Sequence, residues 1–197
     1  MYASGYNLEK FRKISSIAIP LDRANVDTDQ IVPKQFLKLI QRTGFGKFLF
    51  YDWRFDQKGE QKPDFVLNDQ KYSNSHILIT GENFGSGSSR EHAAWALKDY
   101  GIDVIISSSF ADIFYNNCFK NGILPIAIPK IMVDELMQTK STIEVDLESQ
   151  TIKHDSAIIP FTIDGGRKKT LLKGLDDIAV TLQHQDKITL YEKNHTL

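Results

Sequence analysis

The fold of this chain is decided by the stretch GENFGSGSSREHAAWAL, residues 81–97. It follows an apolar run at residues 76–80 that predicts a strand, passes through three glycines and changes to helical spacing at Ser88. Glycines at a strand-to-helix turn let the backbone approach a ligand closely, and the N–H groups at a helix N-terminus attract anions. The stretch therefore predicts an anion pocket in an α/β protein, with the hydroxyls of Ser88 and Ser89 and the guanidinium of Arg90 in place.

Composition restricts the classes of protein to consider. The chain has 197 residues, 41% of them hydrophobic, which is enough for one domain with a proper core. The formal net charge of −1 gives no electrostatic reason to bind nucleic acid or an anionic membrane. No apolar run is long enough to span a bilayer, and the first residues lack the apolar core of a signal peptide. We therefore expect a soluble cytoplasmic protein that binds neither nucleic acid nor membrane.

Short β-branched runs alternate with helical patterns along the chain, which is typical of the α/β class. Strands are predicted at residues 16–20, 76–80, 103–107 and 124–129, helices at 88–97, 111–120 and 130–138, and a hairpin at 142–147 and 151–154. Apolar residues at helical spacing also occupy residues 35–50, although Gly44 and Gly46 interrupt them. We expect a single domain, residues 1–197, with a core of about residues 1–164 and a mostly helical extension from about residue 165.

The glycine-rich turn does not match the common nucleotide and hydrolase motifs. No lysine follows it, as a phosphate loop would need, and Arg90 replaces the third glycine of a dinucleotide fingerprint. The nucleophile-elbow pattern G-x-S-x-G is absent from the chain. An alternative interpretation is a capping box, in which Ser88 caps the helix and Glu91 reaches back to it. Capping needs one serine, whereas the turn has Ser86, Ser88 and Ser89, so a ligand site is favoured.

Two blocks of sequence resemble a known family. Residues 84–92, FGSGSSREH, are similar to the signature of the swivelling domain of the aconitase superfamily, and residues 25–33, NVDTDQIVP, resemble a second block. The resemblance covers about residues 17–191 and implies a three-layer β/β/α swivelling domain with a mostly helical C-terminal extension. Four more segments resemble the bacterial small subunits of 3-isopropylmalate dehydratase in order and spacing: TGFG at 43–46, DWRF at 52–55, SFADIFYNN at 109–117 and GLDDIAVTLQH at 174–184.

The resemblance also implies a reaction. Members of this family are subunits of a hydro-lyase of leucine biosynthesis, which interconverts 2-isopropylmalate and 3-isopropylmalate through 2-isopropylmaleate. The Lewis acid is an iron of a [4Fe–4S] cluster that three cysteines of the large subunit hold. With Cys118 as its single cysteine, this chain is expected to bind no metal or cofactor itself and to act as a heterodimer with the large subunit. The family usually has cysteine at Ser86 and proline at Ala94, and neither change removes a group that the chemistry needs.

Four residues receive roles from their positions in the two blocks. Ser88 matches a catalytic serine that acts as a base, and Asp29 matches an aspartate that organises acid–base groups near the iron. Arg90 matches the arginine that holds a carboxylate of the substrate, and Ser89 adds a hydrogen bond to the same group. A free serine is a poor base, so helix N–H groups and Arg90 are expected to stabilise its anion. Without the resemblance, Asp29 is equally well explained as a turn-capping side chain.

The run at residues 35–39 lies, in relatives, where the variable group of the substrate sits. Phe36, Leu37 and Leu39 make it largely apolar, which suits an isopropyl group. For any one of these residues, a place in the core of a helix has stronger support from the sequence. Lys38 leaves a more acidic substrate open.

Three other residues of reactive type are expected to be structural. Arg54 is most simply a member of a surface or structural ion pair, and Cys118 a small buried apolar residue. His92 lies one helical turn after Ser88, where a supporting or structural role is favoured.

Two alternative functions stay open on the sequence. The same scaffold serves related hydro-lyases of homoaconitase or of citraconate and methylmalate type, which a comparison of branched and tricarboxylic substrates would distinguish. The other alternative is an anion-binding module without catalysis, which a partner carrying an iron–sulfur cluster would contradict.

Overall fold

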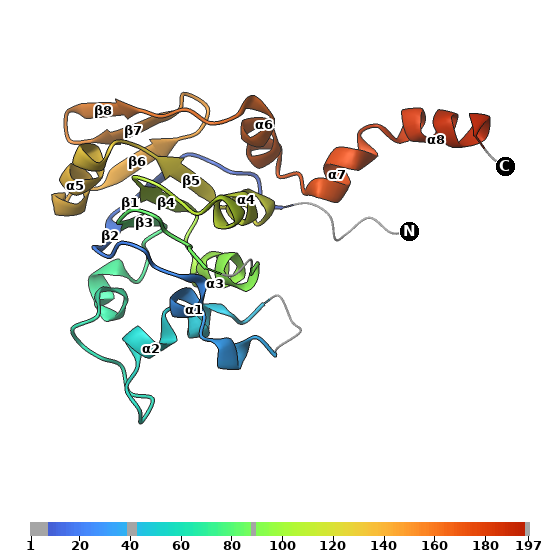
Figure 1. Cartoon of the computed structure of the whole chain (residues 1–197). Helices are drawn as coiled ribbons and strands as arrows, with labels where there is room; N and C mark the ends of the chain where they lie inside the picture. Colours follow the sequence, from blue (N-terminus) through green and yellow to red (C-terminus); the bar gives the residue numbers. More distant parts are fainter. Residues whose placement is uncertain (1–7, 39–42, 88–89, 196–197) are drawn as a thin grey trace.

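Two four-stranded sheets and a set of helices build the molecule in layers (Figure 1). The computed structural model describes residues 8–38, 43–87 and 90–195. The strands are β1 (Ile14–Ser16), β2 (Ala18–Leu21), β3 (Ile77–Thr80), β4 (Val104–Ser107), β5 (Leu124–Ala127), β6 (Ile143–Asp146), β7 (Thr151–His154) and β8 (Ala157–Pro160). The helices are α1 (Thr28–Ile31), α2 (Tyr51–Arg54), α3 (His92–Tyr100), α4 (Asp112–Lys120), α5 (Lys130–Gln138), α6 (Gly165–Lys173), α7 (Asp177–Leu182) and α8 (Gln185–Asn194), with 3-10 turns η1 (Lys34–Phe36), η2 (Gly46–Phe48), η3 (Val66–Asn68) and η4 (Gln70–Tyr72).

The central layer is a parallel sheet in the order β2-β3-β4-β5, and the second sheet is antiparallel in the order β1-β6-β7-β8. All four residues of β3 are buried, because both faces of this sheet are covered. Side chains alternate along β3: Ile77 and Ile79 pack in the cluster shared with the antiparallel sheet, whereas Leu78 packs in the cluster under α1, α3 and α4. This order of layers confirms the predicted three-layer β/β/α domain.

Most elements lie where the sequence predicts them, and the parallel strands do so to within a few residues. The sequence analysis did not find β8, which continues the hairpin through a turn with Asp155 in the left-handed region at φ 47°. The helical spacing at residues 35–50 was misleading. The described part of that segment forms only the turns η1 and η2, and Gly44 (φ 86°) and Phe50 (φ 50°) both take left-handed backbone angles that a helix excludes.

The C-terminal region divides after α6. Leu171 of α6 is 1% exposed and belongs to the core beside the sheets, whereas every residue from 181 to 195 is exposed. Helices α7 and α8 extend away from the body (Figure 1). The helical character of the region after residue 165 is confirmed, while its division from a core at residues 1–164 stays a prediction. Within the described ranges, no helix is both long and apolar enough to cross a membrane.

Candidate functional site

The described parts of the two sequence blocks, residues 25–33, 84–87 and 90–92, lie beside each other at the carboxyl end of the parallel sheet. One follows β2 and the other follows β3, and these strands are neighbours. The backbone N–H groups of Gly85 and Ser86 both donate to the carbonyl oxygen of Val26, at 2.8 and 3.1 Å. Because the carboxyl ends of parallel strands are the usual ligand edge of an open α/β sheet, the two blocks meet where a site is expected.

Backbone conformation explains why Gly85 has to be glycine. Its φ is 78°, and a Cβ atom at this position would overlap the ring of Phe114, which is buried at 2% exposure. Two asparagines also take left-handed backbone angles. Asn25, the first residue of one block, has φ 55°, and Asn83, which directly precedes the other block, has φ 54°. Their side chains join, with Asn83 Nδ2 donating to Asn25 Oδ1 at 2.9 Å. The two loops are therefore one unit held by backbone and side-chain bonds.

A carboxylate between two cations is the main charged feature of this unit. The Arg90 guanidinium forms an ion pair with Asp29, and Lys34 Nζ lies 3.1 Å from the other carboxylate oxygen of Asp29. The side chains of Arg90 and Asp29 are 23% and 35% exposed, whereas that of Lys34 is 71% exposed. The predicted site residues Asp29 and Arg90, 61 positions apart, are thus in direct contact.

Helix α1 is capped by Asp27, which leaves Asp29 free for this pairing. The Asp27 side chain accepts from the backbone N–H groups of Asp29 and Gln30, each at 2.8 Å, and the Gln30 side chain accepts from Asp27 N at 2.9 Å. This is a complete capping box. The turn-capping role that the sequence left open for Asp29 is therefore filled by Asp27.

A cavity of about 210 Å³ opens next to Arg90. Its walls come from both blocks and from the start of α4: Thr28, Gly85, Gly87, Arg90, residues 111–114 and Asn117. The first N–H groups of α4 face no earlier turn of their own helix, so this end of α4 adds partial positive charge to the wall. A cavity with one guanidinium and a helix N-terminus suits a small carboxylate.

Helix α3 begins later than the sequence predicts. It starts at His92 with Glu91 as N-cap, so the expectation of a helix that opens at Ser88 is wrong. The Glu91 side chain accepts from Asn121 Nδ2 at 3.1 Å, which ties it to the end of α4. Arg90 consequently extends from a loop that precedes the helix.

His92 packs among aromatic rings, as the structural interpretation of this residue predicts. Its ring centroid lies 5.3 Å from that of Phe45 and 4.6 Å from that of Trp95. Burial lowers the pKa of His92, and the positive charge of Arg90 lowers it further. The neutral imidazole is therefore favoured near pH 7.

Phe36 and Leu37 are half-buried against the core, as the helix-core alternative suggested, although η1 is only one 3-10 turn. The Phe36 ring stacks on Phe48 with centroids 4.1 Å apart and meets Tyr51 edge-on at 4.9 Å. Contact of these side chains with a substrate stays a prediction. Three predicted site residues, Ser88, Ser89 and Leu39, lie outside the described residues.

Arg54 and Cys118 have the structural roles that the sequence indicates, with one difference. Arg54 is 8% exposed and donates to Asn68 Oδ1 at 3.2 Å and to the carbonyl oxygens of Gly46 and Leu49, each at 3.4 Å, so its bonds are to neutral acceptors. Desolvation lowers the pKa of Arg54. Cys118 is fully buried in α4, and burial raises the pKa of its thiol well above the usual value.

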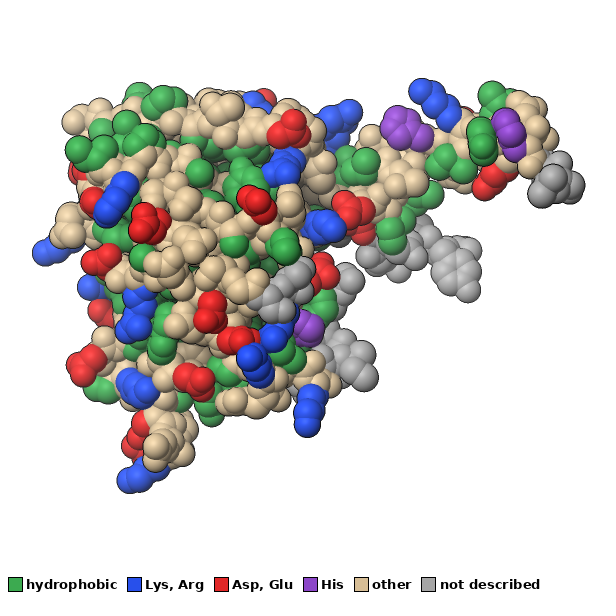
Figure 2. Space-filling view, in the orientation of Figure 1, with side chains coloured by type: hydrophobic (Ala, Val, Ile, Leu, Met, Phe, Trp, Pro, Cys, Tyr) green, Lys and Arg blue, Asp and Glu red, His purple; other side chains and the backbone are tan. Residues whose placement is uncertain are grey.

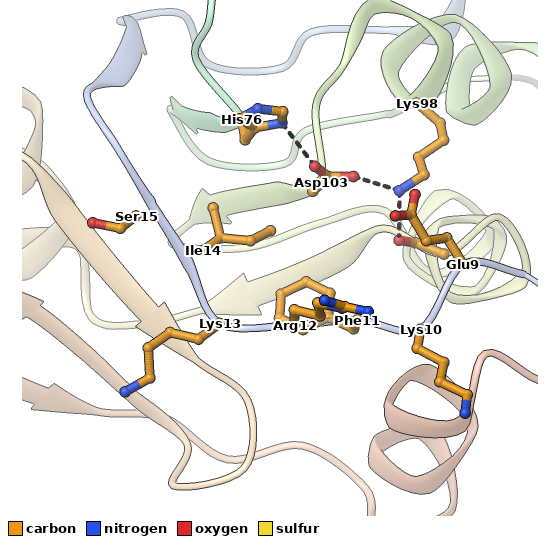
Figure 3. A pocket seen from close by; sticks show the side chains of 11 residues that line it. Glu9, Lys10, Phe11, Arg12, Lys13, Ile14, Ser15, His76, Lys98 and Asp103 are labelled. Carbon is orange, nitrogen blue, oxygen red and sulfur yellow. Dashed lines mark hydrogen bonds and ion pairs between the residues drawn. The ribbon is translucent and has the colours of Figure 1, made fainter.

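A second cavity, of about 280 Å³, lies at the opposite edge of the parallel sheet, between residues 9–15 and the starts of β3 and β4 (Figure 3). Asp103 projects into it between two bases: His76 Nδ1 is 2.8 Å from one carboxylate oxygen, and Lys98 pairs with the other. Lys98 also donates to the carbonyl oxygen of Gly122 at 3.4 Å. Each cavity thus has an ion-paired aspartate beside it, but the cavity beside Arg90 lies at the carboxyl end of the parallel strands, the usual ligand edge, and is the better candidate site.

Sequence reasoning missed two contributions to the site. Lys34 directly follows the 25–33 block but was not singled out, because its pairing with Asp29 is visible only in the structure. The start of α4 was predicted as part of a helix and of a resembling segment, but no role in the site was given to it. Its position after β4, a neighbour of β3 in the parallel sheet, would have placed it at the same edge.

The layers and the paired loops define a class of protein. Residues 8–131 match the family model of the aconitase C-terminal domain, and residues 177–197 match the model of the C-terminal domain of 3-isopropylmalate dehydratase small subunits. A solved structure, the 3-isopropylmalate dehydratase of Methanocaldococcus jannaschii, superposes with a TM-score of 0.63 at 26% identity, over 92% of this chain and 99% of that one.

Sequence relatives narrow the class further. The 3-isopropylmalate dehydratase small subunit of Parvibaculum lavamentivorans is 54% identical over 192 residues, which cover 94% of this chain and 96% of that protein. The small subunit of Dinoroseobacter shibae is also 54% identical, over 94% of this chain and 95% of that protein. The chain belongs to the family of 3-isopropylmalate dehydratase small subunits, within the aconitase superfamily.

Proposed function

We propose that the chain is the small subunit of a 3-isopropylmalate dehydratase, a hydro-lyase that moves a hydroxyl between adjacent carbons of isopropylmalate in leucine biosynthesis. It works with a large subunit, and we place the complex in the cytoplasm. The observation that carries the proposal is the convergence of Asp29 and Arg90 beside a cavity at the ligand edge of the sheet. The two residues come from separate blocks of the sequence, and the fold brings them together.

Arg90 holds a carboxylate of the substrate in this proposal. A guanidinium presents two parallel N–H donors that match the two oxygens of a carboxylate. In the free subunit the guanidinium of Arg90 is paired with Asp29, so a substrate carboxylate has to share the guanidinium with Asp29 or displace that side chain. Lys34, 3.1 Å from the second oxygen of Asp29, keeps that side chain neutralised when Arg90 turns to the substrate. Lys34 is thus a positioning residue in our proposal.

Proton transfer is assigned to Ser88, with Asp29 organising the acid–base groups and Ser89 adding a hydrogen bond to the bound carboxylate. Removal of a proton from a carbon beside a carboxylate needs a base close to the group that binds that carboxylate. Ser88 lies two positions before Arg90 in the sequence, which meets this need. The charge of Arg90 favours the anionic form of a nearby hydroxyl. The run at residues 36–39 is proposed to face the isopropyl group.

The donor atoms of this chain do not fit an iron–sulfur cluster. Its single cysteine, Cys118, is enclosed in α4 and held as a thiol by burial. Among the residues that the structure describes, no group of three or more histidine, cysteine or acidic side chains is placed to hold a metal. We therefore propose that the [4Fe–4S] cluster of the enzyme belongs to the large subunit.

Anaerobic reconstitution with a large subunit tests the function. The isolated chain should be inactive and free of iron, and the mixture should interconvert 2- and 3-isopropylmalate faster than tricarboxylic analogues. Ser88→Ala should lower the rate at least about 10²-fold while leaving assembly intact. Ser86→Cys, two positions away, is the matched control and should change little. Stoichiometric iron in the isolated chain, or substantial activity of Ser88→Ala, would contradict the assignment.

A further inference from the structure

Helices α7 and α8, residues 177–194, form an arm that packs little against the rest of the described chain. Apolar side chains are exposed along it: Ile178 (47%), Val180 (37%), Leu182 (50%), Ile188 (38%), Leu190 (62%) and Tyr191 (64%). Figure 2 shows these apolar groups on an extension that stands clear of the body. Helices of 6 and 10 residues are too short to be stable alone in water, so the arm needs a surface to pack against.

The spacing of these residues makes an apolar face on each helix. Ile178 and Leu182 are four apart in α7, and Ile188 and Tyr191 are three apart in α8, so each pair lies on one side of its helix. The arm is attached to the body through a weak contact. Lys120 Nζ lies 3.8 Å from Asp177, and both side chains are more than half exposed, which makes this a screened surface ion pair.

The root of the arm lies beside the end of α4, the same helix whose start lines the Arg90 cavity. Lys120 is the last residue of α4 and touches the arm, whereas Asp112 and Ile113 at its first turn line the cavity. Nine helical residues span about 13 Å. Ile113, Asn116 and Lys120 are all exposed and lie at helical spacing, so one exposed face of α4 runs from the cavity rim to the arm.

We propose that the arm is the docking element for the large subunit, which would cover α7 and α8 and continue along α4 to the Arg90 cavity. This inference rests on the proposed function, because that function requires a second subunit at the cavity. The residue range of the arm supports the large subunit as its partner. The model named for small subunits of this enzyme matches residues 177–197, whereas the aconitase C-terminal domain model ends at residue 131. The segment that the small-subunit model matches thus carries six of the exposed large apolar side chains.

Substitutions on the arm test the proposal in the full chain. Leu182→Ser and Ile188→Ser place a hydroxyl on the apolar face of each arm helix at an exposed position, so neither should disturb the body. The matched control is Ile158→Ser in β8, which is 62% exposed but lies on the antiparallel sheet. Each arm variant should raise the Kd for the large subunit about ten-fold or more, while the control stays within about two-fold. At saturating large subunit, all three should reach the kcat of the unchanged chain.

Three outcomes overturn the proposal, and they differ from one another. Arm variants that bind the large subunit with unchanged Kd, in a system where the unchanged chain binds and turns over, remove the arm from the interface and leave the proposed function standing. Variants that abolish self-association of this chain without changing that Kd assign the arm to a second copy. An unchanged chain that neither binds nor activates the large subunit removes the proposed function as well. Kd from titration calorimetry and mass from sedimentation separate the three.

Discussion

Each end of the parallel sheet has an aspartate between two basic side chains. The two ends differ in the backbone elements that carry those side chains. Asp29 at the carboxyl end is paired with Arg90 and Lys34, and Asp103 at the amino end with Lys98 and His76. Lys98 extends from the last turn of α3 and His76 directly precedes β3. Arg90 stands on a loop, and Lys34 begins a single 3-10 turn.

This difference distinguishes a structural clamp from the proposed site. Asp103 ties α3 to the beginnings of two strands, and Lys98 adds a bond to Gly122, so the cluster fixes the layers against each other. Asp29 has two alternative cations on less regular backbone, and one of them faces a cavity. An ion pair that has to exchange partners with a ligand is better placed on loops, where the side chains can turn without moving a helix or strand.

The largest effect is expected from Arg90→Lys. The change keeps the charge but loses the two-pronged geometry, so kcat/KM of the assembled enzyme should fall about 10²-fold or more for every substrate. Lys98→Arg is the matched exchange at the other aspartate and should leave kcat/KM nearly unchanged. Steady-state assays of both variants with one large subunit make the test, and equal losses would break the distinction between site and clamp.

Next in size is the effect of glycine substitution at the two ends. Gly85→Ala forces a Cβ atom against the buried Phe114 ring at a positive φ, which should lower the free energy of unfolding by about 2–4 kcal/mol. Gly122→Ala is the comparison at the clamp: its φ is 73°, but the nearest atoms to a Cβ are 3.9 Å away. Only backbone strain of about 1 kcal/mol is expected there. Urea unfolding of each variant measures the two values, and a larger loss for Gly122→Ala would contradict the packing argument.

A smaller effect is expected from removing each carboxylate. Asp103→Asn should destabilise the chain by about 1–2 kcal/mol, because a part-buried carboxylate loses its ion pair with Lys98 and weakens its hydrogen bond with His76, and it should spare activity in the complex. Asp29→Asn should do the opposite, with a stability loss below about 1 kcal/mol and a clear loss of activity. Thermal unfolding and the activity assay on both variants test whether stability is lost at Asp103 and activity at Asp29. Equal losses of stability and of activity in the two variants would refute the prediction.

The smallest effect is a pH dependence at His92, next to Arg90. Its pKa is lowered on folding, so the unfolded chain binds the proton more readily. The free energy of unfolding should therefore be fully retained above the ordinary histidine pKa of about 6.5 and decrease as the pH falls below it. Unfolding measured from about pH 7.5 to about pH 5 should show a shallower decrease for His92→Gln than for the unchanged chain. A steeper decrease would mean that the packing of His92 has been misjudged.

The sequence predicted the regular parts of this fold because they depend on local patterns. The buried runs of β3, β4 and β5 and the spacing of α4 and α5 are each visible within about ten residues. The segment at residues 35–50 failed for the opposite reason. Its apolar residues are spaced as in a helix, yet Phe36, Phe48 and Tyr51 pack as aromatic rings across turns, which is tertiary information.

The site was predicted from motif blocks, and its geometry was not. The glycine-rich turn pointed to Arg90 and the resemblance selected Asp29, whereas their direct contact depends on strand order in the parallel sheet. Lys34 has no local pattern that distinguishes it from other exposed lysines, so its role became visible only with Asp29 beside it. The late start of α3 was missed because Ser88 and Glu91 fit a capping pattern, while the Glu91 side chain is used by Asn121 of a distant segment.

The burial of Cys118 affects how this subunit tolerates oxidation during storage in air. Oxidants attack the thiolate, and this thiol is both inaccessible and kept protonated by its surroundings. Burial therefore disfavours sulfenic acid formation at Cys118, and with no second cysteine in the chain no internal disulfide can form. A stock of this subunit kept aerobically should therefore support as much turnover with fresh large subunit as a stock kept under argon, and an aged enzyme should be renewed by replacing its partner alone.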